Sequence, residues 1–409
     1  MARINYKGKD LNHISIGPSK AFDKQDWVSG LDYFRTHPAG TPSTDNPYLI
    51  TVAPGLPEAQ VTAGDTDGLS HLHILGESRV ASILKYSGTG NANPALMLGD
   101  STNPYTNLTI ENIRVVRLGD ATSVAVQLGA DAGDAVGSNN TDSTRRWIDT
   151  RFVNCTFEGG EGIRIFGITT ASSDNSPILE ISNCMFYGMR YGGHIQGNIT
   201  LNSQGTSWVA EAVPTWPWSM TDVAHERQAL TVCMTESSYD SRTAYRFKGD
   251  RVVALGRDLV GGGATLRSLA GLCLIVATAG AAPNIWMHGC RLRAVYGDTD
   301  GTITSPRFGA VFCRAGAFSL DQVICQSCNF EVVQESGGNY TGVMAGVVDN
   351  INGAVIRVSG HVLAVDAGSA SEYSLASQVA GANIYHMVTS ATAKNTGSAG
   401  TYTAETLVA

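Results

Sequence analysis

Short runs of alternating apolar and polar residues recur along most of this chain, and each run ends near an asparagine or a glycine. The clearest copies are Arg151–Gly159 and Glu180–Gly188, in which an alternating run passes into Asn-Cys-x-Phe-x-Gly. Alternation with a period of two indicates a strand with one buried face. Such strands, repeated at intervals of about 20 to 50 residues and joined by glycine turns, are typical of a solenoid.

Weaker copies extend the series in both directions. They are Leu108–Val115, Ile285–Leu292, Val323–Phe330 and Ile356–Leu363. In the last copy, His361 stands where earlier copies have cysteine. Asparagine at a bend can bond its own backbone and tolerates a left-handed conformation, which explains its recurrence at one corner. The pattern predicts an all-β fold, a single-chain right-handed parallel β-helix whose asparagines and cysteines form columns.

The same pattern predicts how the chain is divided. The β-helix is expected over residues 21–370, and residues 1–20 are expected to form an arm with no core of its own. Residues 201–258 interrupt the repeat and are predicted to be a lateral insertion. The C-terminal segment, 371–409, is rich in Ala, Ser, Thr and Gly and weakly patterned, so we expect it to require partner chains to bury it.

An amphipathic helix is predicted before the first rungs. Between Phe22 and Phe34 the apolar residues recur near helical spacing, and Asp23 or Asp26 is available as the N-terminal cap. Pro38 lies just beyond this run, where a proline ends a helix.

Two strand motifs follow that helix. They are Ile-x-Val-x-Pro-Gly at 50–55 and Ile-x-Gly at 74–76. A helix followed by these strands resembles the opening of proteins in the pectin-lyase-like β-helix superfamily. The resemblance covers residues 22–90 closely and 107–365 loosely. It implies a helix that covers the open end of the solenoid, and it implies the fold rather than an activity.

Charge and hydropathy restrict the partners. The 409 residues carry a net charge of −8, and no basic cluster stands out in the sequence. Binding to nucleic acid is therefore not expected. The chain begins with a polar segment, and no apolar run is long enough to span a bilayer, so neither a secretory signal nor membrane insertion is predicted.

Four cysteines share one phase of the repeat. They are Cys155, Cys184, Cys290 and Cys328. This phase would stack them inside the coil as small buried hydrophobic residues. We expect reduced thiols and a chain that folds in a cytosol.

Two motifs are similar to enzyme motifs but depart from them. Trp147-Ile148-Asp149-Thr150 is similar to the Trp-Ile-Asp-His stretch of pectate lyases, with Thr150 in place of the histidine. Gly162–Gly167 is similar to the strand of pectin methylesterases that carries a catalytic aspartate, with Arg164 in its place. Both departures count against those two activities, and the alternative is that Trp147 packs at a bend.

Two pairs of carboxylates are candidates for cleaving a glycan. Glu158 and Glu161 flank a Gly-Gly turn, and Asp298 and Asp300 share a Gly-Asp-Thr-Asp-Gly loop. Such a pair requires carboxyl groups about 5–9 Å apart. The alternative is that these residues are solvated turn residues of the solenoid. The second loop lacks the later glutamate of a calcium loop, and we expect neither a metal nor a cofactor.

Aromatic and histidine side chains are the remaining candidates. Trp208, Trp216 and Trp218 could stack on sugar rings, or they could pack the insertion against the coil. His71 and His73 are expected to face solvent, because Leu72 and Ile74 form the inward pair of their strand.

A polar N-terminal arm, a capped β-helix and a low-complexity C-terminal segment resemble the tailspikes of bacteriophages. The resemblance implies a homotrimeric virion protein, synthesised in the host cytoplasm. Its N-terminal arm would contact other virion proteins, and its β-helix would bind a host surface polysaccharide. One alternative is a glycan depolymerase, a hydrolase or lyase, on the same scaffold. Another is a capsid or tail decoration protein that binds no glycan. Binding without catalysis is the favoured interpretation.

Overall fold

The computed structural model describes most of the chain between residues 3 and 404. Outside the description lie 1–2, 7–8, 67, 89–92, 100–105, 120–121, 130–146, 168–176, 212–223, 235–242, 257–264, 277–283, 298–301, 304–307, 316–322, 336–342, 351–354, 367–370, 378–382, 391–394, 398–400 and 405–409.

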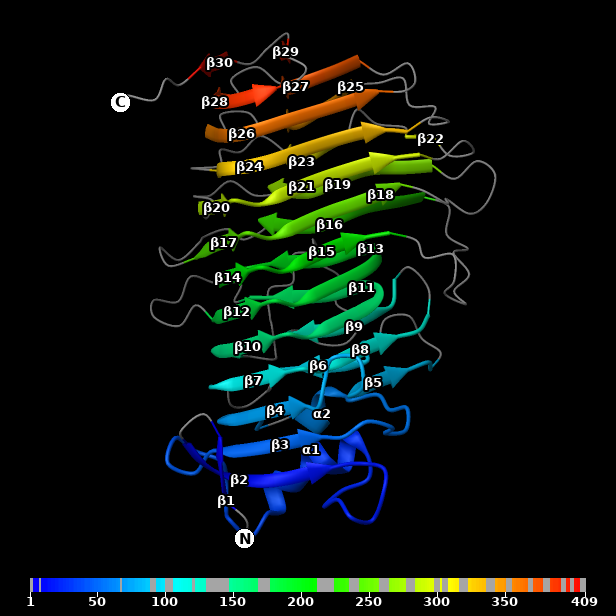
Figure 1. The fold of residues 1–409 in the computed structure, drawn as a ribbon, viewed down its shortest axis with the longest axis vertical. Coiled ribbons are helices and arrows are strands. Elements are labelled where there is room, and N and C mark those ends of the chain that lie inside the picture. Colours follow the sequence, from blue (N-terminus) through cyan, green and yellow to red (C-terminus); the bar gives the residue numbers. More distant parts are fainter. Residues whose placement is uncertain are drawn as a thin grey trace.

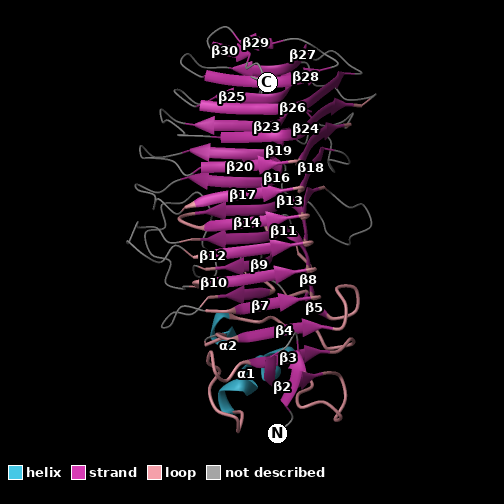
Figure 2. Ribbon diagram, turned by 60° about the vertical axis from the view of Figure 1, so that its left-hand side comes forward, coloured by secondary structure: helices cyan, strands magenta, loops and turns pink. Residues whose placement is uncertain are grey.

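The chain winds into a rod of stacked rungs, and three parallel sheets run along the length of the rod (Figure 1, Figure 2). Each strand pairs in parallel with the equivalent strand of the next rung, as β10 does with β7 and β12. Among the described strands, only β1 (Arg3–Tyr6) pairs antiparallel, with β2 (Lys9–Ile16). The predicted fold, a right-handed parallel β-helix, is confirmed.

The first sheet contains β2 and twelve further strands or parts of strands. These are β3 (Tyr48–Val52), β4 (Leu72–Gly76), β7 (Leu108–Glu111), β10 (Asp149–Val153), β12 (Ile178–Ser182), β14 (Thr200–Gln204), β17 (Ala244–Lys248), β20 (Asn284–His288), the first parts of β24 (Val323–Gln334) and β26 (Val355–Asp366), β28 (Asn383–Ser390), and then also β30 (Thr401–Ala404) at the last rung.

The second and third sheets share several long strands. The second contains β5 (Ile83–Tyr86), β8 (Arg114–Arg117), the first parts of β11 (Thr156–Phe166) and β13 (Met185–Gln196), β15 (Ser207–Ala210), β18 (Arg251–Gly256), β21 (Arg291–Tyr296) and the later parts of β24 and β26. The third contains β6 (Leu96–Leu98), β9 (Val124–Leu128), the later parts of β11 and β13, β16 (Ala224–Met234), β19 (Thr265–Val276), β22 (Thr302–Ile303), β23 (Phe308–Ala315), β25 (Val343–Asn350), β27 (Ser371–Ser377) and β29 (Asn395–Gly397).

The core contains a column of stacked aromatic rings. Phe157, Phe186 and Trp208 occupy one register position on three successive rungs, and all three are fully buried. The ring centroids of Phe157 and Phe186 lie 5.0 Å apart, and those of Phe186 and Trp208 lie 4.3 Å apart, with interplanar angles of 18° and 15°. The phenylalanine of the sequence motif is therefore an inward residue, and its repetition builds a continuous stack.

The predicted column of asparagines lies at the corner between the first and second sheets. Asn154 Nδ2 donates a hydrogen bond of 2.6 Å to Asn112 Oδ1 on the preceding rung. Every residue of the column has a left-handed backbone, which asparagine and glycine adopt most readily. The column comprises Asn112, Asn154, Asn183, Gly205, Gly249, Gly289 and Ser327, with φ between 50° and 64°.

The cysteines that follow this corner point into the core. The backbone N–H of Cys155 lies 3.4 Å from the Cys184 sulfur on the next rung. All seven cysteines with described side chains are buried and free. The predicted stacked, reduced thiols are confirmed for Cys155, Cys184, Cys290 and Cys328, the four that follow this corner.

The prediction that His361 continues the cysteine column is wrong by one residue. Cys328 pairs with Gly360, whereas His361 pairs with Asn329 and is exposed. A Cβ at position 360 would come within 1.8 Å of the Cys328 carbonyl oxygen, so this close approach of two rungs requires glycine.

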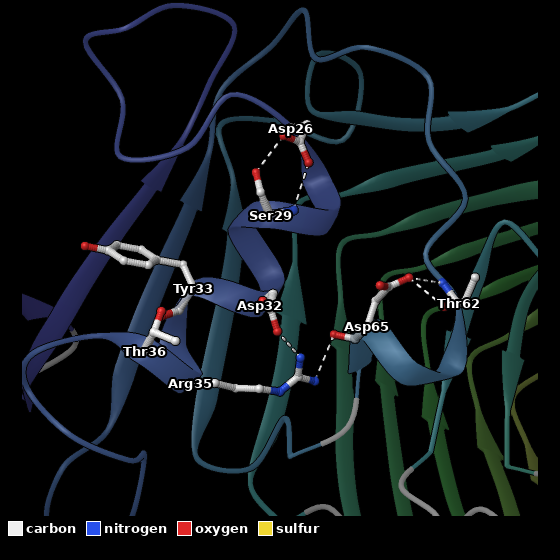
Figure 3. A network of polar contacts seen from close by, with 8 residues as sticks. All are labelled: Asp26, Ser29, Asp32, Tyr33, Arg35, Thr36, Thr62 and Asp65. Atoms are coloured by element: carbon white, nitrogen blue, oxygen red, sulfur yellow. Dashed lines mark hydrogen bonds and ion pairs between the residues drawn. The ribbon is translucent and has the colours of Figure 1, made fainter.

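The predicted helix is α1 (Trp27–Thr36), and it covers the N-terminal end of the rod (Figure 1). Asp26 is its cap, and it accepts hydrogen bonds from the Ser29 backbone N–H at 2.8 Å and the Ser29 hydroxyl at 2.6 Å (Figure 3). The buried residues Trp27, Leu31 and Phe34 face the first rung.

A short second helix, α2 (Ala63–Thr66), lies beside α1. Arg35 contacts Asp32 and also donates a 3.2 Å hydrogen bond to the Asp65 carbonyl oxygen, which ties the two helices together (Figure 3).

The domain boundaries differ from the predicted ones at the N-terminus. Residues 9–16 form β2, which pairs in parallel with β3. Leu11, Ile14 and Ile16 of β2 are buried in the core. This part of the predicted arm is therefore integrated into the first rung, because its alternation places three apolar side chains inward.

The described parts of 201–258 are likewise continuous with the coil. Strands β14 to β18 pair with the rungs before and after them. The sequence between these strands does not follow the repeat, and for this reason the sequence pattern predicted an insertion here. Strands β27 to β30 continue the parallel pairing through residues 371–404.

Candidate functional site

A groove of about 710 Å³ lies on the outer face of the first sheet, at its N-terminal rungs. It crosses β4, β7 and β10 and is bounded by the segment that leads into β3. The polar residues that line it are Thr44, Asp45, Tyr48, His71, His73, Asn107, Thr109, Glu111, Asp149 and Arg151.

Strand alternation places these side chains on the outer face. In β4, Leu72 and Ile74 are buried and His73 is partly exposed between them. In β7 the partly exposed residues are Thr109 and Glu111. His73, Thr109 and Arg151 pair in register, so they form one row across three rungs. The prediction that Leu72 and Ile74 form the inward pair is confirmed.

His73 and Glu111 form the central polar pair of the groove. His73 Nε2 lies 3.0 Å from Glu111 Oε2, and both side chains are about 15% exposed. This arrangement leaves polar atoms at the groove surface, where they can exchange hydrogen bonds with hydroxyl groups of a ligand.

The β10 side of the groove carries a carboxylate and a cation. Burial raises the pKa of Asp149, the charge of Arg151 opposes that shift, and Glu180 reinforces it. The Arg151 Nε donates a 2.7 Å hydrogen bond to Glu180 Oε2 on the next rung. Arg151 therefore links the groove to the rung above.

His71 and Asn107 form the edge of the groove where β4 and β7 begin. Both have a left-handed backbone, with φ of 54° and 52°. Asn107 Nδ2 lies 3.2 Å from His71 Nδ1, and Thr106 Oγ1 lies 3.3 Å from His71 Nε2. This histidine is therefore held by neighbouring side chains on the next rung.

Three carboxylates line the groove, and two of them, Glu111 and Asp149, are poorly placed as a pair for glycoside hydrolysis. Glu111 pairs with Val153, which lies four residues beyond Asp149 on β10. Four residues of strand correspond to about 13 Å. An inverting glycosidase pair requires about 6.5–9.5 Å and a retaining pair about 5.5 Å. Glu111 and Asp149 are therefore too far apart along the strands to act as a glycosidase pair.

The predicted carboxylates Glu158 and Glu161 are each engaged by an arginine. Glu158 Oε2 lies 2.7 Å from Arg114 Nη2. Glu161 is 2% exposed and receives hydrogen bonds of 2.8 and 3.0 Å from Arg164. Burial acts to raise the pKa of Glu161, but the Arg164 charge and hydrogen bonds lower it to about 2. The ion pairs with Arg114 and Arg164 therefore explain why Glu158 and Glu161 are present, without a role in binding or cleaving a substrate.

Arg164 therefore has a structural role in place of the aspartate expected by similarity to pectin methylesterases. On the other side of Glu161, His194 Nδ1 lies 3.8 Å from Glu161 Oε2, and its Nε2 lies 3.4 Å from the Cys233 sulfur. Burial lowers the pKa of His194, with Glu161 opposing. All of these groups are at most 8% exposed.

Trp208 is not a surface residue. It is fully buried and its indole nitrogen donates a 3.1 Å hydrogen bond to Asp250 Oδ2. The prediction that it stacks on a sugar is wrong, because its position on β15 points inward. Trp216, Trp218, Asp298 and Asp300 lie outside the described residues. Trp147 is also buried, with its indole nitrogen donating 3.1 Å to the Phe166 carbonyl oxygen.

An aromatic residue that was not predicted as a site residue does reach the surface. Trp286 on β20 is partly exposed, between the buried residues Ile285 and Met287. The guanidinium of Arg246 lies 4.9 Å from the centroid of its ring. The alternation of its own strand, with apolar neighbours on both sides, is the signal that identifies it as outward.

Within the described parts of the chain, no three His, Cys, Asp or Glu side chains are grouped as a metal site would require. No described helix has the length and apolar character needed to cross a membrane. A comparison with protein-family models found no match, and a comparison with curated proteins found none.

Proposed function

We propose that this protein is a virion structural protein, a phage tailspike or tail fibre subunit that binds a host surface glycan. The observation that carries the proposal is the groove on the outer face of a rigid β-helix. Its rim of Asp, Glu, His, Asn, Thr and Arg side chains offers both donors and acceptors to sugar hydroxyls. The resemblance of the sequence to the pectin-lyase-like superfamily and to tailspikes also supports this proposal.

Adhesion is favoured over depolymerisation within this proposal. Glu158 and Glu161 are held in ion pairs, and Glu111 and Asp149 are offset by about 13 Å along the strands. A particle that only holds its receptor requires none of these groups as an acid or a base. Decoration of a capsid or tail without glycan binding remains a separate outcome of the test.

The partners follow from the same proposal. The subunits would assemble as a homotrimer in the virion after synthesis in the host cytoplasm. Contacts to other virion proteins would involve residues 1–20, which include β1 and β2 at the N-terminal end of the rod (Figure 1).

The test uses the purified full chain and a panel of bacterial capsular polysaccharides and lipopolysaccharides. Binding is measured by calorimetry, and polymer length is measured by size-exclusion chromatography after incubation. Binding at constant polymer length is the expected result. Shortening of the polymer would support the depolymerase, and no binding to any surface glycan would support decoration.

Two groove variants locate the site. We expect Glu111→Gln and Arg151→Gln to weaken glycan binding about five- to tenfold each, because each removes a charged hydrogen-bonding group from the groove. Lys20→Gln, an exposed residue outside the groove, is the matched control. Unchanged binding in both groove variants would place the glycan elsewhere on the rod.

A further inference from the structure

Positively charged side chains gather at one corner of the rod although the chain as a whole carries a net charge of −8. They lie on two neighbouring rungs, at the ends of β17 and β20 and the starts of β18 and β21. We refer to the four cations Arg246, Lys248, Arg251 and Arg291, together with the neighbouring His288, as the cationic corner, and all five side chains are exposed.

The register brings like charges together across the corner. Arg251 pairs directly with Arg291 on the next rung. Like charges at facing positions of neighbouring strands are destabilising. Two adjacent rungs therefore keep an unfavourable pairing that a bound anion would relieve.

Little of this positive charge is neutralised by the protein. Glu331 Oε2 lies 2.8 Å from Arg291 Nη2, and its Oε1 lies 3.0 Å from Arg293 Nε. In the described part of the chain, no carboxylate lies within ion-pair distance of Arg246, Lys248 or Arg251. Their charges are available to a ligand at the surface.

Uncharged polar side chains border the cationic corner on the rungs before and after it. Asn202 and Gln204 pair with Arg246 and Lys248 from the preceding rung. On the following rung, Gln326 pairs with His288. Cations flanked by amide groups suit a polymer that carries both anionic groups and hydroxyls.

From these observations we propose that the cationic corner binds an acidic polysaccharide, one whose sugars carry carboxylate groups. The proposal rests on the proposed glycan-binding function and specifies the class of glycan. It also assigns a second contact region, several rungs from the groove on β4, β7 and β10.

A polysaccharide fits this corner better than a nucleic acid. Binding of single-stranded nucleic acid relies on aromatic faces on which bases stack. Trp286 is the aromatic residue of the corner, but Arg246 lies over its ring at 4.9 Å, and Ile324 occupies the next register position. The cations and amides of the corner remain exposed, whereas one face of the ring is occupied by the guanidinium.

The experiment titrates the full chain with oligogalacturonate, with a neutral maltooligosaccharide of the same length, and with a single-stranded DNA oligonucleotide. Calorimetry gives the affinities, and the part of the tryptophan fluorescence change that Trp286→Phe abolishes reports binding at the corner. We expect oligogalacturonate to bind, the neutral oligomer to bind at least about tenfold more weakly, and added salt to weaken the binding of oligogalacturonate.

The variant for the test is Arg246→Gln/Lys248→Gln/Arg251→Gln, which removes the three charges that have no carboxylate partner among the described residues. We expect its affinity for oligogalacturonate to fall about tenfold or more, on the scale of three exposed charge contacts. Lys20→Gln removes one surface charge far from the corner and should bind as the native chain does. Circular dichroism and thermal unfolding verify that both variants are folded.

Failure of this inference differs from failure of the proposed function. If the triple variant binds acidic and neutral glycans as tightly as the native chain, the corner is not the site, although glycan binding stands. Tighter binding of DNA than of oligogalacturonate would replace the polysaccharide with a nucleic acid. If the native chain binds no glycan of the surface panel or of this series, both proposals are wrong.

Discussion

Individual corner residues determine how the chain turns from the first sheet to the second. Asn112, Asn154 and Asn183 use a left-handed backbone on early rungs, and glycine takes the same position on later ones. Gly249 has φ of +64°, and nothing lies within 4 Å of the place where a Cβ would be. A side chain at this position is therefore unfavourable only because a residue with a Cβ is strained in the left-handed backbone conformation.

Because a side chain at position 249 would strain the backbone but would not clash with other atoms, substitutions of Gly249 test the backbone conformation alone. We expect Gly249→Ala to lower the free energy of unfolding by about 1 kcal/mol, and Gly249→Asn to lower it by less, because asparagine tolerates the left-handed region. Chemical denaturation of the three proteins measures the difference. Equal losses for alanine and asparagine would contradict the role assigned to the corner.

Asp250 is the acidic member of a column in which other rungs carry cysteine or threonine. It accepts hydrogen bonds from the Ser203 hydroxyl at 2.5 Å, the Thr206 N–H at 3.0 Å and the Trp208 indole at 3.1 Å. Burial raises the pKa of Asp250 to about 6, in spite of these hydrogen bonds, which act in the opposite direction. The folded chain therefore holds a proton that the unfolded chain releases near pH 4.

A pH dependence of stability follows from Asp250. Because its folded pKa is raised above the unfolded value, its contribution to stability is present at pH 4 and is lost as the pH rises to about 6. The loss amounts to about 2–3 kcal/mol. Denaturation between pH 4 and 7 should show this slope in the native chain and a flatter one in Asp250→Asn. Parallel pH profiles would show that Asp250 does not titrate in this range.

At the scale of elements, the long strands β11 and β13 each serve two sheets. The register of β11 with β13 shifts between Gly159 and Glu161, and the strand turns from the second sheet into the third there. Charged and polar side chains at and beyond such a turn are not necessarily exposed: Glu161 and His194 are 2% and 8% exposed. Alternation alone therefore separates the two faces of a strand, but it does not measure exposure.

The stack of Phe157, Phe186 and Trp208 joins successive rungs through the core. We expect Trp208→Ala to lower the free energy of unfolding by about 3–5 kcal/mol, because it leaves a large cavity and removes a donor from Asp250. Trp208→Phe keeps a ring in the stack and should cost less. Denaturation measures both losses.

Trp208 also distinguishes packing from ligand contact. Glycan affinity of folded Trp208→Phe should equal that of the native chain, since the ring does not reach the surface. A selective loss of affinity at unchanged stability would mean that this tryptophan contacts the ligand after all.

At the scale of the whole molecule, the β-helix is a rod whose N-terminal end is covered by α1 (Figure 2). Its lateral surface carries the groove and the cationic corner. A rigid rod holds these two regions at a constant separation on different rungs. One long polymer could therefore contact both regions, and several subunits side by side would multiply such contacts.

The proposed trimer gives a prediction for the intact protein. Light scattering coupled to size-exclusion chromatography should give the mass of three chains, unchanged on dilution across the micromolar range. A mass of one chain under these conditions would remove the support for a tailspike, while the fold would stand.

The sequence by itself determined the class of fold and the direction of many side chains. Period-two alternation identified the strands, and the recurring Asn-Cys of the repeat located the corner and the thiols. These are local properties, because strand direction and left-handed turns depend on neighbouring residues. The helix cap at Asp26 is local for the same reason.

Only the tertiary structure decided which outward residues meet. The groove joins His73, Glu111 and Asp149 from three rungs, and the cationic corner joins Arg251 to Arg291 across irregular sequence. Segments of variable length separate the rungs, so sequence spacing does not reveal which residues are in register. Proximity along the rod depends on backbone hydrogen bonds between rungs, and these form only when the whole coil is wound.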